Sequence, residues 1–365
     1  MQYDVIVVGA GPSGSIAAEK CAKEGLKVAL LEKADTIGTK VCAGGLEPRI
    51  LHEFDIDKSI IETLIQKAFF HIVDDKDTVH ETKSTRLGAT TYRSKFDRYL
   101  SDRAVEAGAD LFLSSYCQGV VNDKAQAKGV QVFFTRKKEL VKLLGDVIVA
   151  ADGFNSIIVK STDFPERYTA SDVALAIQYE VSTEKEVKED AIHLFYGDSI
   201  SKIGYGWIFP KKKGFTVGVG CLLSLTKAVA LLESLERLMA LGINIMKPYT
   251  VLHRSKLQAS CIPLKPRKTL VQSNILVVGD AAGQVSIFEG AGIYYGMAAG
   301  RLAAKVIVDA TSKGDFSEET LKTYEVEWTR LFGEEMKHQR DVLDLILSSN
   351  NPTRWYLSLV LRKYS

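Results

Sequence analysis

The sequence is poor in cysteine, and the few that it has are scattered. There are five, an odd number, and no two of them form a Cys-x-x-Cys pair: Cys21, Cys42, Cys117, Cys221 and Cys261. This pattern argues against a disulfide framework and against a zinc ribbon, and it fits a reducing compartment. We therefore expect a cytoplasmic protein without a metal site.

Neither charge is in excess. The 365 residues include 47 Lys and Arg against 45 Asp and Glu, which gives a formal net charge of +2. Nucleic-acid binding depends on clustered positive charge that neutralises phosphates. A nucleic-acid partner is therefore not expected.

Long apolar runs are also missing. The longest falls well short of the ~18 residues that a membrane-crossing helix needs. The first residues lack the basic region and the cleavable small-residue site of a secretory signal. Mean hydropathy is nevertheless +0.01, which is high for a soluble chain. Two expectations follow: an internal slot for an apolar ligand, and peripheral contact with the cytoplasmic face of a membrane.

Three Val- and Ile-rich runs predict buried parallel strands at 3–8, 146–150 and 275–278. They are apolar at consecutive positions, which is typical of central strands covered on both faces. A small-residue helix over 13–23 and a strand over 26–32 complete one βαβ unit after the first run. Because the three strands lie far apart in the chain, the α/β domain that they build must be discontinuous.

The segment between the second and third runs is predicted to be an inserted antiparallel sheet. Its strand-like runs are 174–181, 191–196, 206–210 and 215–221. Lys211-Lys212-Lys213-Gly214 is typical of a solvated hairpin tip, and the alternative is capture of a diphosphate or phospholipid head group. Either interpretation places all three lysines at the surface.

Helices are predicted after this sheet. One covers 225–241, with its buried face marked by five leucines: Leu231, Leu232, Leu235, Leu238 and Leu241. A second helical zone covers 318–347 and ends before Asn350-Asn351-Pro352. The stretch 354–364 combines apolar, aromatic and basic residues, so it is expected either to lie at a membrane surface or to dock onto the protein itself.

The strongest motif is Gly9-Ala10-Gly11-Pro12-Ser13-Gly14, between the first strand and its helix. Its first glycine permits a tight turn, the second lets the backbone approach a pyrophosphate, and the third permits close packing of helix on strand. The anion would bind at the helix N-terminus. Glu32 ends the next strand, where a carboxylate binds ribose hydroxyls, which predicts FAD or NAD rather than NADP.

Further motifs follow in a characteristic order. Asp152-Gly153 and Gly279-Asp280 follow the second and third strands. Asp280, at a strand end beside a helix start, suits a hydroxyl-rich chain such as ribitol. The remaining motifs are Lys40-Val41-Cys42-Ala43-Gly44-Gly45-Leu46, Arg93-Ser94-Lys95-Phe96-Asp97-Arg98-Tyr99-Leu100, Tyr205-x-Trp207-x-Phe209-Pro210, Val217-Gly218-Val219-Gly220 and Gly290-Ala291-Gly292-Ile293.

Together, over about residues 3–310, these motifs resemble FAD-dependent oxidoreductases with the para-hydroxybenzoate hydroxylase type fold, and within them the geranylgeranyl reductase family. The resemblance implies a Rossmann-like α/β fold with an inserted antiparallel β-sheet domain and a short C-terminal helical region. The expected domains are an FAD-binding domain of 1–68, 92–160 and 265–317, a substrate or cap domain of 69–91 and 161–264, and a helical region of 318–365.

The resemblance also implies roles for individual residues. The expected FAD contacts are Gly9, Gly11, Pro12, Ser13, Gly14, Glu32, Lys33, Cys42, Ala43, Gly44, Arg93, Arg98, Asp152, Gly153, Gly279, Asp280, Gly290, Gly292 and Ile293. The expected substrate contacts are Tyr205, Trp207, Phe209, Pro210, Gly218 and Gly220, for which a place in the core is the alternative. Cys42 and Glu289 are expected to be catalytic, as proton sources; the alternatives are a small buried residue and a solvated loop carboxylate.

The activity that the resemblance implies is saturation of isolated C=C bonds in an isoprenoid lipid or prenyl diphosphate. Reduced FAD would supply hydride, and NAD(P)H or a ferredoxin-like protein would supply electrons. One alternative is an FAD-dependent monooxygenase of a small apolar or aromatic substrate. Another is an isoprenoid-binding protein that has lost its flavin, against which the intact glycine motif and Glu32 argue.

Overall fold

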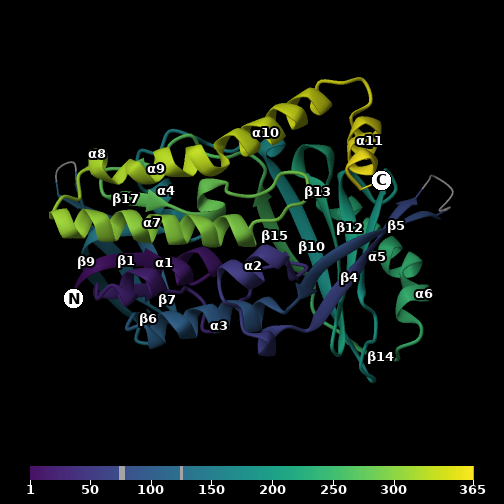
Figure 1. The fold of residues 1–365 in the computed structure, drawn as a ribbon, viewed down its shortest axis with the longest axis horizontal. Helices are drawn as coiled ribbons and strands as arrows, with labels where there is room; N and C mark the ends of the chain where they lie inside the picture. Colours follow the sequence, from purple (N-terminus) through teal and green to yellow (C-terminus); the bar gives the residue numbers. More distant parts are fainter. Residues whose placement is uncertain (74–78, 124–125, 365) are drawn as a thin grey trace. The chain divides into compact units, whose positions relative to one another are not determined.

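The computed structural model describes residues 1–73, 79–123 and 126–364 (Figure 1). The chain forms two compact units, each assembled from three separate segments. Unit 1 consists of 1–39, 94–167 and 263–340, and unit 2 of 40–93, 168–262 and 341–365. The expected discontinuity of the chain is therefore present. The functional domains predicted above stay a prediction, and 74–78 of the expected cap segment lie outside the described residues.

Unit 1 is built on a mainly parallel sheet. Its strands run in the order β16 (Val271–Gln272), β17 (Ile275–Val277), β9 (Glu139–Ala150), β1 (Gln2–Val8), β2 (Val28–Leu31) and β6 (Asp110–Phe112). The five strands from β17 to β6 are parallel, and β16 is antiparallel to β17. The antiparallel strands β7 (Ser115–Asp123) and β8 (Gln126–Phe134) extend β9. The three predicted parallel strands are confirmed.

Two helices of unit 1, α1 (Pro12–Lys23) and α7 (Ile293–Lys313), pack directly on each other (Figure 1). A Cβ at Gly296 would overlap the Ser13 hydroxyl, and a Cβ at Gly300 would overlap the Ser13 carbonyl oxygen. Glycine at both positions therefore allows the two helix backbones to approach. The other helical elements that belong wholly or mainly to this unit are α3 (Arg93–Glu106), α4 (Ile157–Lys160), η4 (Gly279–Ala282), α8 (Glu318–Leu321), α9 (Thr323–Trp328) and the π-helix η5 (Thr329–Gly333). The residues of α10 (Glu334–Leu347) are divided between the two units.

Unit 2 is built on a large mixed sheet. Its strands run in the order β14 (Val251–Arg254), β10 (Val173–Thr183), β13 (Gly214–Leu222), β12 (Ser201–Lys211), β11 (Ala191–Gly197), β4 (Thr63–Val73), β5 (Val79–Thr90) and β3 (Gly45–Leu46), and β15 (Gln258–Pro263) pairs with β10. The predicted antiparallel arrangement holds for β10 to β13. β11 also pairs in parallel with β4, a strand from an earlier segment of the chain for which no partner was predicted.

One face of this sheet is covered by α5 (Ala228–Leu241). Leu231, Leu235 and Leu238 are buried there, as the helical period predicts. The prediction is wrong for Leu232, which is exposed because it lies about 100° around the helix from Leu231. Leu241 is partly buried against the same core. The shorter helices of unit 2 are α2 (Pro48–Glu53), η1 (Lys58–Ile60), η2 (Ala170–Asp172), η3 (Leu223–Leu225) and α6 (Ile243–Met246).

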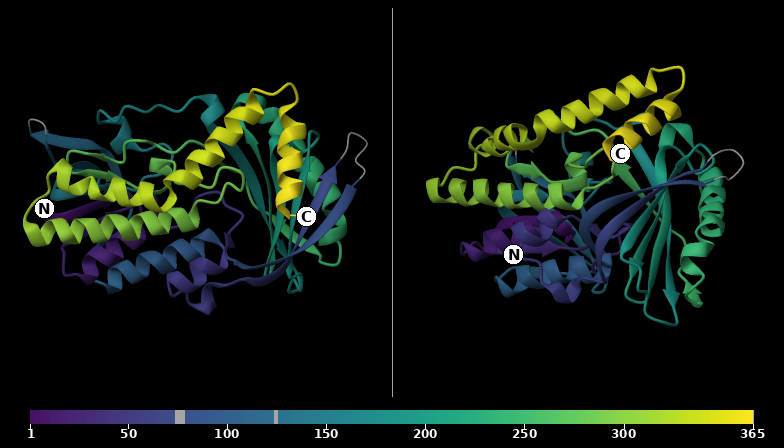
Figure 2. Two further views of the ribbon diagram at one scale, coloured as in Figure 1. Left: turned by 45° about the horizontal axis from the view of Figure 1, so that its top comes forward. Right: turned by 45° about the vertical axis from the view of Figure 1, so that its right-hand side comes forward.

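The terminal helix α11 (Pro352–Tyr364) docks on unit 2 beside β11 and β12 (Figure 2). Tyr356 and Val360 are buried, and the Tyr356 ring lies 6.4 Å from that of Tyr196. Trp355 is 62% exposed. One face of α11 therefore docks onto the protein itself, which was one of the two expectations for this stretch. Contact of the other face with a membrane stays a prediction. Over the described residues, no helix combines the length and apolarity needed to cross a bilayer.

Candidate active site

In unit 1, four predicted cofactor segments follow the carboxyl ends of four adjacent parallel strands. Gly9 follows β1, Glu32 follows β2, Asp152 follows β9, and Gly279 follows β17. Because these strands are parallel, their carboxyl ends meet at one edge of the sheet (Figure 1). This edge is where open α/β sheets bind their ligands.

The three motif glycines have different surroundings. A Cβ at Gly9, where φ is +106°, would overlap Ala151 O, and a Cβ at Gly14 would overlap Gly9 O. Both glycines are therefore required by packing. Gly11 has an ordinary extended backbone, with φ −73° and ψ −179°, and no heavy atom within 4 Å of the position of a Cβ. The space beside Gly11, at the N-terminus of α1, is open in the way that a pyrophosphate would need.

Glu32 is held against the glycine motif. Its carboxylate is half-buried and accepts hydrogen bonds from Ala10 N at 3.2 Å and from Ala34 N at 3.0 Å. The acid is thereby fixed next to the open space at Gly11 without any ligand. The donor set at this edge therefore fits the adenosine and pyrophosphate of FAD.

Asp152 serves a local structural purpose. Its Oδ2 accepts hydrogen bonds from Ile157 N at 2.6 Å and Ile158 N at 3.3 Å, which are at the start of α4. Burial raises the pKa of this carboxyl. Next to it, Gly153 has a φ of +79° and open space at its Cβ position. Contact of either residue with FAD stays a prediction.

The loop after β17 is fixed by a buried polar network. Gly279 N donates to Gln284 Oε1 at 2.6 Å, Gln284 Nε2 bonds to Tyr324 OH at 2.8 Å, and Tyr324 OH donates to Val277 O at 3.0 Å. This network positions Asp280, the predicted ribitol partner. Sequence reasoning missed Gln284 and Tyr324, because the tyrosine lies on α9, in a region where only helical periodicity was visible.

The loop of predicted flavin contacts at Gly290, Gly292 and Ile293 is also braced within unit 1. Gly292 caps α7. Ser286 N donates to Ala291 O at 3.0 Å, and Ile287 N donates to Gln339 Oε1 at 2.7 Å. Glu289 is half-buried in this loop. Its role as a proton source stays a prediction.

The three basic residues predicted to contact FAD lie in different environments. Arg98 pairs with Asp102 at 2.7 Å on the exposed side of α3. Lys33 is exposed, and Arg93 is buried. Their contacts with FAD stay predictions.

In unit 2, Tyr205, Trp207 and Phe209 share one face of β12, opposite the α5 side. The Trp207 indole lies flat over the neighbouring strand β13, since a Cβ at Gly218 would overlap its ring and one at Gly220 would lie 3.7 Å away. Trp207 and Phe209 are 6% and 9% exposed, and Tyr205 is half-buried. Glycine on β13 therefore provides the space in which the indole lies.

The predicted hairpin tip is correct for Lys212 and Lys213 and wrong for Lys211. Lys211 is the last residue of β12 and is fully buried. Strand alternation places it on the same face as Trp207 and Phe209, which is why its side chain points inward. Its Nζ donates to Ala43 O at 2.7 Å. Burial lowers the pKa of Lys211 to about 7.

The predicted flavin loop of Cys42, Ala43 and Gly44 is fixed within unit 2. Gly44 N donates to Cys42 Sγ at 3.3 Å, and Thr91 N donates to Gly44 O at 2.8 Å. Gly44 has a φ of +73°, and its Cβ would overlap Thr91 O, so only glycine fits. Cys42 is half-buried. The alternative interpretation of Cys42, as a small residue buried in the core, therefore fits only in part.

Residues 2–337 match the family described as the FAD binding domain. The chain is 32% identical, over 331 residues, to the digeranylgeranylglycerophospholipid reductase of Methanocaldococcus jannaschii, covering 89% of this chain and 82% of the relative. The chain belongs to the geranylgeranyl reductase family. The digeranylgeranylglycerophospholipid reductase of Thermoplasma acidophilum is 30% identical, covering 93% of this chain and 86% of the relative.

The solved structures agree with this geranylgeranyl reductase assignment. A geranylgeranyl bacteriochlorophyll reductase-like protein from Thermoplasma acidophilum superposes with a TM-score of 0.81 at 26% identity, covering 100% of this chain and 96% of the other. A myxobacterial chondrochloren halogenase matches at 19% identity with a TM-score of 0.73, over 97% of this chain and 86% of the other, which shows a shared fold. The predicted fold class, the FAD cofactor and the class of FAD-dependent oxidoreductase are confirmed.

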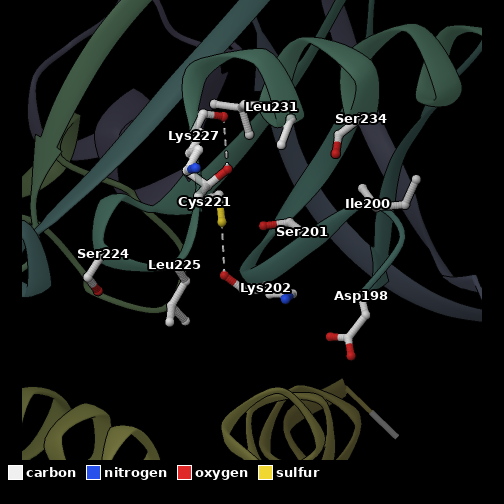
Figure 3. A pocket seen from close by; sticks show the side chains of 12 residues that line it. Asp198, Ile200, Ser201, Lys202, Cys221, Ser224, Leu225, Lys227, Leu231 and Ser234 are labelled. Carbon is white, nitrogen blue, oxygen red and sulfur yellow. Dashed lines mark hydrogen bonds between the residues drawn. The ribbon is translucent and has the colours of Figure 1, made fainter.

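This geranylgeranyl reductase also has a surface cavity of about 520 Å³ in unit 2 (Figure 3). It lies beside the start of α5, and its lining includes Ser201, Lys202, Cys221, Lys227 and Leu231. None of the predicted substrate residues lines it. Over the described residues there is also no cluster of side chains suited to hold a metal ion.

Proposed function

We propose that this reductase saturates isolated double bonds in the isoprenoid chains of an ether-type phospholipid or a prenyl diphosphate. The observation that carries the proposal is the aromatic face of β12 over the bare glycines of β13, in a chain of the geranylgeranyl reductase family. Aromatic and apolar side chains with few polar groups suit a long hydrocarbon chain. The relatives are named for the digeranylgeranylglycerophospholipid that they reduce, which supports this substrate class.

The protein's residues would bind and orient the reactants. Bound FAD, once reduced, supplies a hydride to one alkene carbon. The open backbone at Gly11 and the carboxylate of Glu32 would hold its adenosine end, and Asp280 its ribitol. An isolated alkene is not activated by a neighbouring group, so orientation and exclusion of water must contribute much of the rate enhancement. Cys42 and Glu289 are the proposed proton sources for the second carbon.

Electron supply and membrane contact belong to the same proposal. We expect NAD(P)H or a ferredoxin-like protein to supply electrons, since the chain has no second glycine motif of the Gly9–Gly14 type. The outward side of α11 carries an exposed Trp355 beside Arg354. Aromatic and basic residues together favour a membrane interface, where the lipid substrate would lie.

The function is tested by anaerobic reoxidation. The purified holoprotein, reduced with dithionite, is mixed with unsaturated digeranylgeranylglycerophospholipid or with geranylgeranyl diphosphate, and flavin absorbance is followed. We expect reoxidation by the isoprenoid and a product that has gained pairs of hydrogens in mass spectrometry. No reoxidation by the isoprenoid, followed by a transient flavin hydroperoxide and a hydroxylated product once oxygen is admitted, would overturn the proposal in favour of the monooxygenase.

Trp207→Ala should change the set of isoprenoids that are reduced. Removing the indole opens space over Gly218, so bulkier or longer chains gain and the natural chain is held less firmly. Truncation of a buried tryptophan costs about 3–5 kcal/mol of stability, so Trp207→Phe is tested beside it. Products are compared by mass spectrometry with those of Trp328→Phe, the control at a buried tryptophan on α9 of unit 1. An unchanged product set in both Trp207 variants would show that this face does not contact substrate.

A further inference from the structure

Lys211 is a fully buried lysine at the end of β12. Its ammonium has one hydrogen-bond acceptor, the uncharged Ala43 O at 2.7 Å, and lies 5.7 Å from the centre of the Tyr92 ring. Over the described residues it forms no ion pair. A fully buried ammonium without a carboxylate partner is costly. A methionine of similar length would avoid that cost, so a charged residue at this position indicates a functional role.

Three ionisable groups from three different segments act on this ammonium. They are Cys42 in the loop, Glu62 before β4 and Glu180 on β10, and each of them in its charged form favours the charged form of Lys211. Glu62 is fixed nearby, because its Oε2 accepts a hydrogen bond from Lys212 N at 3.2 Å. Burial outweighs all three and lowers the pKa of Lys211 to about 7. The ammonium is therefore present below neutral pH and is lost above it.

Lys211 also holds the loop that carries the thiol. Ala43 O accepts a second hydrogen bond, from Thr216 Oγ1 at 2.9 Å. Two donors from β12 and β13 therefore fix the residue directly after Cys42. The Lys211 ammonium is thereby fixed one residue along the chain from the Cys42 thiol.

We propose that Lys211 is a positioning residue that fixes the Cys42–Gly44 loop and stabilises the thiolate of Cys42. In reduction of a double bond, hydride adds to one carbon and a proton from the Cys42 thiol adds to the other, leaving a thiolate. The Lys211 ammonium balances that charge until the thiolate takes a proton back from solvent. This use of the thiol rests on the proposed function, whereas the coupling of the two side chains is measurable without turnover.

The test is the rate of alkylation of Cys42 by iodoacetamide. Cys261→Ser removes the other half-buried thiol, and Cys21, Cys117 and Cys221 are buried. In this background, Lys211→Gln keeps a donor for Ala43 O and removes the charge. At about pH 6.5 we expect it to slow alkylation roughly tenfold, because the reacting thiolate then has no opposite charge beside it. At about pH 9, where Lys211 is already neutral, the variant and the parent should react alike.

Two further variants separate charge from structure. Lys211→Arg keeps the charge and should restore the rate at the lower pH, and Lys212→Gln, at the exposed turn, should have no effect. Equal rates for Lys211→Gln and its parent at both pH values would overturn the inference. Faster alkylation of Lys211→Gln at both would also overturn it, since the lysine would then only shield the thiol. The assay uses holoprotein without substrate, so failure of lipid reduction leaves its outcome unaffected.

Discussion

Replacing Gly11 with valine should abolish retention of FAD and leave the apoprotein folded. The backbone at Gly11 is one that any residue adopts, and the Cβ position is empty to 4 Å. The new side chain therefore fits the protein alone. It fills the space through which a pyrophosphate would reach the N-terminus of α1. We expect the Kd for FAD to rise on the order of a hundredfold or more, which is about 3 kcal/mol.

The measurement pairs calorimetric titration of FAD with thermal unfolding of the apoprotein. Gly14→Val is the contrasting variant, because any Cβ there overlaps Gly9 O, and it should lose the fold as well as the flavin. Wild-type affinity in Gly11→Val would show that the cofactor does not approach this turn. A folding defect in Gly11→Val would show that the space has another structural use.

Replacing Lys211 with methionine should stabilise the apoprotein at acidic and neutral pH. The folded pKa of about 7 lies below the ordinary value of 10.5. Between these two values the unfolded chain binds more protons at this site than the folded one, so wild-type stability rises with pH there. Below pH 7 the full cost of burying the charge applies, about 4–5 kcal/mol. Loss of the hydrogen bond to Ala43 O offsets about 1 kcal/mol.

Urea unfolding at a series of pH values checks this expectation. The advantage of Lys211→Met over wild type should be greatest at about pH 6 and should shrink as the pH rises toward 10.5. Lys212→Met, whose lysine is exposed, should show no such trend. An advantage that does not change with pH would mean that the gain comes from packing and that Lys211 does not titrate in the folded protein.

The sequence predicted those parts of the fold that a short pattern within one segment of the chain defines. The turn at Gly9–Gly14 and the strands β1, β9 and β17 were visible because a glycine spacing and short apolar runs suffice to define them. The parallel pairing of β11 with β4 was not visible, since nothing local specifies a partner from a distant segment. The network of Gln284 with Tyr324 was missed for the same reason.

Lys211 shows a different reason for a wrong prediction. Three consecutive lysines followed by glycine are typical of a solvated turn. The prediction of an exposed Lys211 followed from this local composition and not from the alternation of inward and outward side chains along the strand. Extending the alternation of Tyr205, Trp207 and Phe209 by one step would have placed Lys211 on the same inward face. A charged residue that continues the inward-facing positions of a buried strand is therefore a sequence signal for a buried charge in the candidate site.

The close packing of α1 and α7 has a consequence for how the cofactor is bound. Ser13 is enclosed by Gly279, Gly296 and Gly300, which leave no space for a methyl group beside it. The turns after β1 and β17 and the first turns of α7 are therefore packed closely against one another. Such a preorganised cradle loses little conformational entropy when a dinucleotide enters. Most of the binding energy of its contacts then remains available as affinity.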